Sequence, residues 1–361
     1  MSVSTLAGHP LHPSTIRTQV DAVLQDFLDA KSAAANESGL PGNISQAIRQ
    51  HLHAGGKRLR PLLCVAGWHA AGGRGDTGAV LRTAAALEMF HAFCLIHDDI
   101  MDNSATRHGQ PTIHHHLATL HGAGQQPEHA RQLGEGAALL VGDMALAWSD
   151  ELLHSSDLAP RLFTNLRRVV DVMREEVIYG QYLDLTAALG PAEDVDVALK
   201  VIRYKTAKYT VERPLHIGAT LAGANDPFLT ALSGFALPLG EAFQLRDDLL
   251  GVFGNPEATG KPALDDLREG KHTVLIALTL NRAHPAQAGQ LRSLLGNPQL
   301  AEDQAEAARR IITATNAPAL VEAMIAARYE QALTELDHLP CPSTASAALR
   351  HLATLATERA S

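Results

Sequence analysis

Apolar residues that repeat every three or four positions run through almost the whole chain, and this helical pattern limits the possible folds more than any other feature. Ala and Leu dominate, β-branched runs are short, and Gly or Pro interrupts the sequence at spacings that suit helices and short loops. Several predicted helices are apolar on more than one face, which is typical of the central helices of a bundle. The fold class is therefore predicted to be all-α, with the clearest helices at residues 18–35, 79–102, 161–189, 198–222, 229–251 and 301–338.

The breaks between these helices are short. They fall at residues 38–43, 71–76, 122–128, 255–262 and 339–343. None is long enough to be an interdomain linker. We expect a flexible leader at residues 1–15, which contain Pro10 and Pro13, followed by one domain at 16–361.

Composition excludes several classes of protein. With 361 residues, 46% of them hydrophobic, the chain can bury a large core. Its net charge of -9, without a stretch dominated by Lys and Arg, argues against a nucleic-acid partner. The sequence shows neither a secretory signal nor an apolar run long enough for a membrane span. Cys64, Cys94 and Cys341 are far apart and odd in number, so we expect a cytoplasmic protein without disulfides.

An aspartate-rich motif ends one of the most apolar predicted helices. Asp98 and Asp102 are four residues apart, so on a helix they share one face and their carboxylates can coordinate a hard cation together. Carboxylate oxygens are the ligands that Mg²⁺ prefers. The alternative is a solvated acidic helix end, because a short motif can match by accident.

A second pair, Asp247 and Asp248, lies late in another apolar helix. Two such helices facing each other would make a carboxylate-lined mouth over an apolar cavity. Mg²⁺ takes only one or two carboxylates and fills its shell with water and substrate phosphates. A diphosphate is therefore the expected ligand.

Basic residues provide the matching charge. Lys57, Arg58 and Arg60 follow Gly55-Gly56 in a turn where backbone amides and side chains can converge on an anion. A single cation of this kind is more often a solvated surface residue. The occurrence of several cations together with the two aspartate motifs is what indicates a diphosphate site. Further cations follow the acidic motifs, at Arg107, Lys205, Lys208, Lys261, Arg268 and Lys271.

Taken in order, the segments GGKRLRP, HDDIMDNSATRHG, GQYLDL, YKTAKYT, FQLRDDLLG and TGKPALDDLREGK resemble the trans-isoprenyl diphosphate synthases, or polyprenyl synthetases. The likeness is to the geranylgeranyl-type enzymes of actinobacteria. It implies a single large helical bundle around a central apolar cavity, usually a homodimer. The implied activity is Mg²⁺-dependent condensation of isopentenyl diphosphate with an allylic diphosphate, either dimethylallyl, geranyl or farnesyl.

The resemblance also implies roles for individual residues. Isopentenyl diphosphate is expected at Gly56, Lys57, Arg60 and His91, with His108 in the same region. Three Mg²⁺ ions are expected, two at Asp98 and Asp102 and one at Asp247, with Asp99 and Asp248 behind these ligands. The residues expected to hold the allylic diphosphate or to lie near the developing cation are Arg107, Lys205, Lys261, Lys271, Thr206 and Gln244, with Gln181 and Asp184 lining the same mouth.

Two positions depart from the family pattern. Most members have two arginines after the first motif, whereas this chain has Arg107 followed by His108, which weakens one cation or makes it dependent on pH. Gly251 stands where many members carry the last aspartate of the second motif, so Asp247 has no i+4 partner. We expect activity to survive with Asp247 as the main ligand.

Product length is expected to depend on the helix that carries Asp98. Phe90, Phe93 and Cys94 lie one to two turns before the motif and could form the cavity floor. Geranylgeranyl diphosphate is the preferred product and farnesyl diphosphate the alternative, although both Phe side chains could simply fill core.

Two other functions remain open. A class I terpene cyclase or head-to-head condensing enzyme would share the first motif, but would not need the basic turn of Lys57 and Arg60 for a second diphosphate. A non-catalytic partner subunit is suggested by His108 and Gly251, whereas intact Asp98, Asp102 and Asp247 argue for catalysis.

Overall fold

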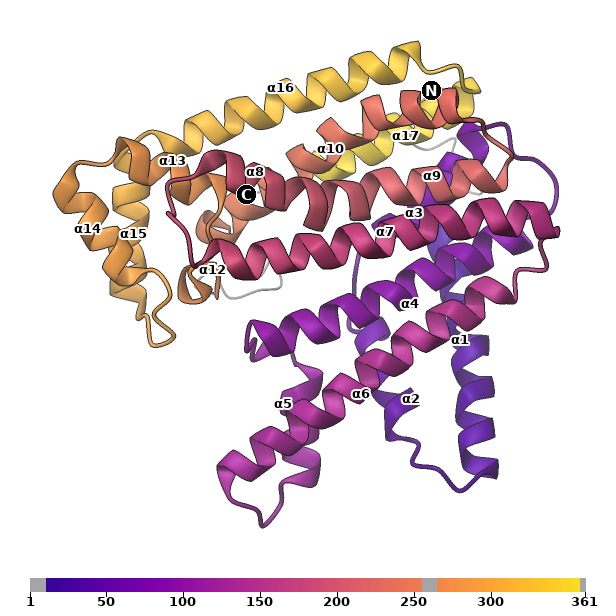
Figure 1. The fold of residues 1–361 in the computed structure, drawn as a ribbon, viewed down its shortest axis with the longest axis horizontal. Helices are drawn as coiled ribbons and strands as arrows, with labels where there is room; N and C mark the ends of the chain where they lie inside the picture. Colours follow the sequence, from indigo (N-terminus) through magenta and orange to yellow (C-terminus); the bar gives the residue numbers. More distant parts are fainter. Residues whose placement is uncertain (1–10, 255–264, 358–361) are drawn as a thin grey trace. The chain divides into compact units, whose positions relative to one another are not determined.

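The structure, a computed structural model, describes residues 11–254 and 265–357. The chain divides into two compact units, Met1–Ala66 with Arg74–Pro160, and Gly67–Gly73 with Arg161–Ser361. Each unit is helical (Figure 1). Within the described ranges the only strands are β1 (Thr106–Arg107) and β2 (Gln110–Pro111), so the predicted all-α class is confirmed.

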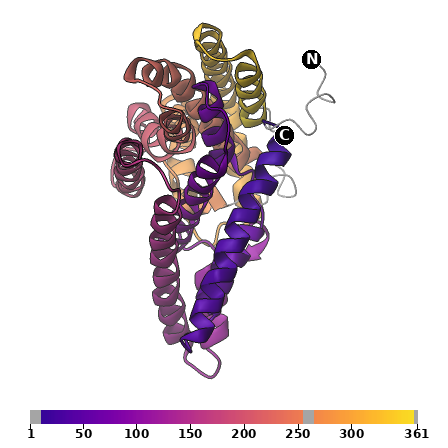
Figure 2. The same cartoon turned by 90° about the vertical axis from the view of Figure 1, so that its right-hand side faces the viewer.

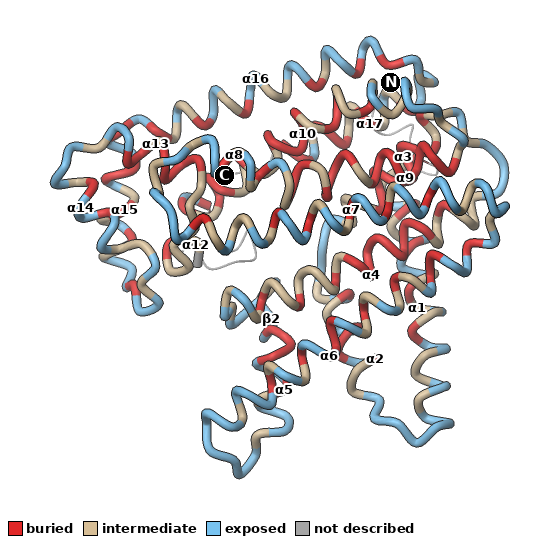
Figure 3. The backbone as a smooth tube through the Cα atoms, in the orientation of Figure 1, coloured by how far each residue is buried: buried red, intermediate tan, exposed pale blue. Residues whose placement is uncertain are grey.

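The first unit is built around α4. This helix packs along α6 and also contacts α1, while α5 folds back onto α6 (Figures 1 and 2). Buried residues follow α4 (Figure 3), and small side chains such as Ala84 and Ala85 allow its neighbours to approach closely. The helices of this unit are α1 (Pro13–Glu37), α2 (Asn43–His53), α4 (Gly78–Met101), α5 (Ile113–His121), α6 (Pro127–His154) and the first part of α3 (Leu59–Ala70).

The second unit is built around α10, which packs against α16 and the π-helix η2. Leu245 and Leu249 of α10 join Ile276 and Val321 in one apolar core. The elements are α7 (Pro160–Ala187), α8 (Val195–Val201), η2 (Ile202–Glu212), α9 (Arg213–Leu221), α10 (Asp226–Phe253), α12 (Asp265–Glu269), α13 (Val274–Arg282), α14 (Pro285–Leu294), α15 (Glu302–Ala314), α16 (Ala317–His338) and α17 (Ser343–Thr357).

Close backbone contacts hold η2 in place. A Cβ at Gly180 of α7 would come within 2.6 Å of Lys205 Cα, and one at Gly240 of α10 would come within 2.5 Å of Ala207 Cα. Only glycine permits these approaches, because real Cβ atoms do not come so near to backbone atoms. Glycines on two helices therefore fix the position of the π-helix.

Three predicted boundaries were wrong. The helix expected at 198–222 is divided into α8, η2 and α9, with Pro214, which has no N–H to donate, at the start of α9. The helix expected at 301–338 is broken at Asn316, whose φ of 62° is left-handed, and α16 starts at Ala317 with Pro318 in its first turn. The expected leader extends too far, because α1 begins at Pro13. Residues 1–10 lie outside the described residues.

Two helices, α4 and α10, are long and apolar enough to cross a bilayer by length and composition. In α4, 61% of the most apolar window is buried inside the protein, and in α10 the share is 50%. Core helices of globular proteins pass the same test, so the feature is weak evidence for a membrane span.

Candidate active site

The basic turn before α3 has an unusual backbone. Gly55, Gly56 and Arg58 have φ values of 128°, 134° and 50°. The glycines adopt such values without a steric penalty, whereas Arg58 must be held in this conformation by its contacts. Lys57 is exposed, and its carbonyl accepts a hydrogen bond from Arg17 Nε at 3.1 Å. The turn thus presents Lys57 outward on a backbone that is anchored to α1.

Positive charge is concentrated beside this turn. Burial and the charges of Arg60, His51, Arg107 and Arg58 lower the pKa of His91 well below its usual value. The predicted partners His91 and Arg60 are therefore electrostatic neighbours in the first unit. The sequence did not predict that His51 belongs to this group. Burial and the charges of Arg107, His108 and Arg58 lower its pKa to about 3.

The first aspartate motif ends α4 as predicted. Asp98 and Asp102 are partly exposed, whereas Asp99 is buried. Arg107 donates to Asp99 through Nε at 2.9 Å and Nη2 at 2.6 Å, and its Nη2 lies 3.6 Å from Asp98 Oδ2. Because this forked ion pair fixes the guanidinium, Asp99 holds Arg107 beside the two accessible carboxylates.

The β1–β2 hairpin carries Arg107 to that position. Its two central residues, His108 and Gly109, both have positive φ, at 50° and 72°. Such a pair is what a tight two-residue hairpin turn requires. The tip lies against the glycine turn, since a Cβ at Gly55 would be 3.9 Å from His108 Cγ. The structure therefore brings His108 to the predicted isopentenyl diphosphate region.

The donor set of the first motif fits Mg²⁺. Asp98 and Asp102 offer accessible carboxylate oxygens one helical turn apart, and Mg²⁺ needs only one or two such groups when phosphate and water complete its shell. Among the residues that the structure describes, no three His, Cys, Asp or Glu side chains gather closely enough to hold a metal ion by themselves. Bound phosphate oxygens would be part of the site.

The second unit holds another group of predicted residues. Lys205 Nζ donates to Asp184 Oδ2 at 2.5 Å. Thr206 Oγ1 donates to Gln244 Oε1 at 2.7 Å, and Gln244 Nε2 donates to Asp248 Oδ1 at 2.7 Å. The predicted residues Thr206 of η2 and Gln244 and Asp248 of α10 are thus joined in one hydrogen-bonded row.

The two aspartates of the second motif differ in environment. Asp247 is partly exposed, and Asp248 is buried. Burial raises the pKa of Asp248 to about 8. The negative charges of Asp266 and Asp247 also raise this pKa, whereas the hydrogen bond from Gln244 lowers it. Asp266 also occupies the space beside Gly251, where a Cβ would come within 2.6 Å of its Cγ. Asp247 is therefore the accessible carboxylate of the pair.

Two predicted cations near this motif have different outcomes. Lys271 Nζ lies 2.6 Å from Glu269 Oε2 and 3.8 Å from Asp266 Oδ1, so it is next to the second motif. The prediction for Lys261 lies outside the described residues.

The proposed chain-length residues lie together on α4. Phe90 is fully buried, and the ring of Phe93 lies 5.3 Å from that of Phe90 and 4.7 Å from that of His97. Cys94 is partly buried. This packing is compatible with either role, a cavity floor or a filler of the core.

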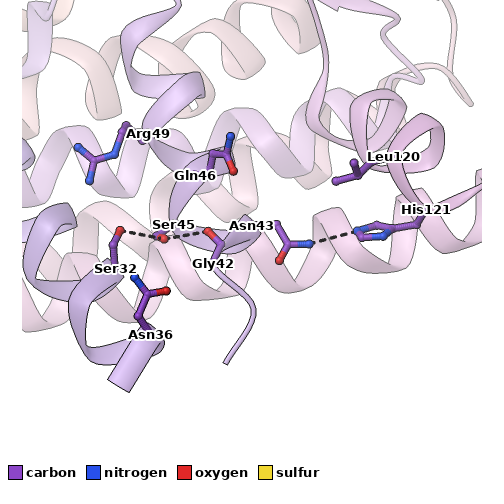
Figure 4. Close-up of a pocket in the computed structure, with 9 residues that line it drawn as sticks. All are labelled: Ser32, Asn36, Gly42, Asn43, Ser45, Gln46, Arg49, Leu120 and His121. Atoms are coloured by element: carbon purple, nitrogen blue, oxygen red, sulfur yellow. Dashed lines mark hydrogen bonds between the residues drawn. The ribbon is translucent and has the colours of Figure 1, made fainter. Parts of the chain in front are cut away.

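A hollow elsewhere in the first unit has a polar lining (Figure 4). Asn43 Nδ2 lies 3.3 Å from His121 Nε2, and Ser32 Oγ donates to Ser45 Oγ at 3.1 Å. Arg49, which also lines it, is paired with Asp29 at 2.7 Å. None of the residues predicted for the site lines this hollow.

Sequence reasoning missed Glu88 and the role of Arg58. Glu88 is buried in α4, and its Oε1 lies 2.8 Å from Arg58 Nη1. Glu88 is the only acidic residue of α4 before the aspartate motif, and this was the available signal.

Comparisons with known proteins show the family to which the chain belongs. A sequence model of the family described as polyprenyl synthetase matches residues 41–312. The crystal structure of geranylgeranyl pyrophosphate synthase from Corynebacterium glutamicum, complexed with isoprenyl diphosphate and magnesium, is similar with a TM-score of 0.89 and 40% identity. The alignment covers 96% of this chain and 98% of that one.

Curated relatives differ in the product that their names give. Geranylfarnesyl diphosphate synthase of Aeropyrum pernix is 32% identical over 92% of this chain and 96% of its own. The (2E,6E)-farnesyl diphosphate synthase of Mycobacterium tuberculosis is 31% identical over 98% of this chain and 91% of its own.

Proposed function

Because this chain belongs to the polyprenyl synthetase family, we propose that it condenses isopentenyl diphosphate with allylic diphosphates and releases an all-trans short-chain product. It is a transferase of isoprenoid biosynthesis. The observation that carries the proposal is that the first unit holds two features suited to a diphosphate. The turn of Gly56, Lys57 and Arg60 can bind one directly, and the accessible carboxylates of Asp98 and Asp102 beside Arg107 would bind one through Mg²⁺. A single diphosphate would need only one of these features, so the presence of both supports two diphosphate substrates.

The residues act mainly by charge. Ionisation of the allylic carbon–oxygen bond leaves a carbocation and a highly charged diphosphate, so groups that bind the departing diphosphate most strongly lower the barrier. Asp98, Asp102 and Asp247 would hold Mg²⁺, which when bound would supply Lewis-acid stabilisation of that leaving group. Arg107, held by Asp99, and Lys205 donate to its oxygens, while Lys57 and Arg60 seat the diphosphate of the second substrate.

The carbon chemistry then requires a sheltered site. The homoallylic double bond attacks the cation, a new carbon–carbon bond forms, and a proton leaves to the released diphosphate. Thr206 and Gln244, joined by a hydrogen bond, would lie near the developing charge. An apolar cavity, expected from the sequence, excludes water that would capture the cation.

Geranylgeranyl diphosphate is the proposed product. The 40% identity with the Corynebacterium glutamicum enzyme supports it, and the farnesyl-forming relative keeps farnesyl diphosphate as the alternative. We further propose three Mg²⁺ ions per site, a cytoplasmic homodimer without a membrane span, and one catalytic domain at residues 16–361.

The experiment is incubation of the purified chain with Mg²⁺, isopentenyl diphosphate and each allylic primer, followed by release of pyrophosphate and analysis of chain length. We expect elongation that stops when EDTA removes the metal, and a loss of at least about 100-fold in rate for Asp247→Ala. Undiminished turnover of Asp247→Ala would contradict the metal assignment. A chain that elongates none of the primers would be a non-catalytic subunit or a cyclase.

A further inference from the structure

The cations of the basic turn do not face the same way. Arg58 is folded back into the protein, and its side chain is 10% exposed. Its Nε donates to Asp21 Oδ1 of α1 at 3.0 Å, its Nη1 to Glu88 Oε1 of α4 at 2.8 Å, and its Nη2 to the Leu52 carbonyl at 2.5 Å. All three guanidinium nitrogens therefore have an acceptor, each from a different segment of the first unit.

From this geometry we infer that Arg58 is a positioning residue for isopentenyl diphosphate and not a ligand of it. This inference rests on the proposed function. Two carboxylates, Glu88 and Asp21, neutralise the guanidinium, so little of its charge is left for a phosphate. Lys57 and Arg60 remain the cations that meet the substrate.

The anchored side chain explains the strained backbone. Arg58 has a left-handed φ of 50°, which a residue with a side chain keeps only when its surroundings hold it there. The guanidinium also lies under the glycine turn, because a Cβ at Gly56 would be 3.6 Å from Arg58 Nη1. Fixing Arg58 fixes the directions in which its neighbours Lys57 and Arg60 leave the chain.

The anchor also connects the two substrate regions. Glu88 and Asp98 lie on the same helix, α4, ten residues apart, which corresponds to roughly 15 Å of helix. The turn is thereby fastened to the element that carries the first aspartate motif. Arg58 sets how far the second diphosphate lies from the metal-binding carboxylates.

The test measures binding of isopentenyl diphosphate by titration calorimetry without Mg²⁺ or primer, and KM and kcat for both substrates. Arg58→Lys keeps the charge but cannot reach three acceptors at once. We expect its Kd and KM for isopentenyl diphosphate to rise at least about tenfold, with KM for the allylic primer changed less than about twofold. The matched control is Arg49→Lys, which alters another arginine–aspartate pair of the same unit and should change neither value.

Glu88→Gln distinguishes positioning from direct binding. If Arg58 bound the substrate directly, removing the negative charge of Glu88 would leave substrate binding unchanged or make it tighter. If Arg58 only positions the turn, losing its bond to Glu88 should weaken substrate binding. We expect weaker binding, and the double variant Arg58→Lys/Glu88→Gln should be no worse than the poorer single variant, since both break one unit. Asp21→Asn, at the more exposed partner, should give a smaller loss in a folded protein even if Glu88→Gln unfolds.

Three results would overturn the inference: unchanged affinity in Arg58→Lys, equal losses for both substrates, or unchanged or tighter binding in a folded Glu88→Gln or, where that variant unfolds, in Asp21→Asn. These outcomes are distinct from failure of the proposed function, in which the unaltered chain itself would neither bind nor elongate isopentenyl diphosphate.

Discussion

Replacing Gly180 by alanine should displace the π-helix η2 and slow catalysis. A Cβ at this position would come within 2.6 Å of Lys205 Cα and closer still to its backbone nitrogen. Ordinary contacts of a Cβ begin near 3.4 Å, so α7 and η2 must separate by about 1 Å. The atoms that clash belong to backbone, which cannot rotate away as a side chain does.

Two magnitudes follow. Overpacking of this kind costs about 1–3 kcal/mol of unfolding free energy, and the helix preference of alanine over glycine returns about 0.5–1 kcal/mol. The net loss should be about 0–2.5 kcal/mol. Because Lys205 and Thr206 move with the backbone, and a shift near 1 Å in a positioning group can cost about 100-fold in rate, we expect kcat to fall by roughly that factor.

Urea unfolding and steady-state kinetics of prenyl elongation measure both effects. Gly289→Ala is the matched control, because a Cβ at this exposed helical glycine of the same unit would have nothing within 4 Å. It should gain about 0.5–1 kcal/mol of stability and keep its kcat. If Gly180→Ala behaved like Gly289→Ala in both assays, the close approach of α7 and η2 would not constrain the site.

Three further changes test other features. Phe93→Ala should lengthen the product in chain-length analysis if its ring forms the cavity floor, and an unchanged distribution would assign it to the core. Gly251→Asp should lower the unfolding free energy by about 1–2 kcal/mol in urea with EDTA, because Asp266 already fills that space, and equal stability would refute this packing. Burial lowers the pKa of His216 to about 4. As pH falls, this histidine therefore takes up a proton in the unfolded chain before it does so in the folded one, and up to about 3 kcal/mol of unfolding free energy should be lost between pH 6.5 and 4. The variant His216→Gln should lose less unfolding free energy over that range.

The sequence was most informative where spacing alone determines geometry. Helical periodicity predicts the all-α class, and the four-residue spacing of Asp98 and Asp102 places both carboxylates on one face. The left-handed break at Asn316 could have been anticipated from Pro318, which favours a helix start.

Other features depended on partners distant in sequence. Nothing in the segment GGKRLRP distinguishes Arg58 from Lys57 or Arg60, because its inward orientation depends on Glu88 thirty residues away. The π-helix likewise depends on Gly180 and Gly240, which lie on other helices. Long-range packing decided these features, and no local preference encodes it.

The wide winding of η2 has a consequence for how this chain tolerates change in length. Its backbone bonds span five residues instead of four, so the segment holds more residues per turn than its α-helical neighbours. Losing one residue within Ile202–Glu212 would let the segment rewind as ordinary helix, which is locally the more favourable form. Lys205 and Thr206 would then point to new sides of the helix, so a shortened protein could fold well and still have lost its chemistry.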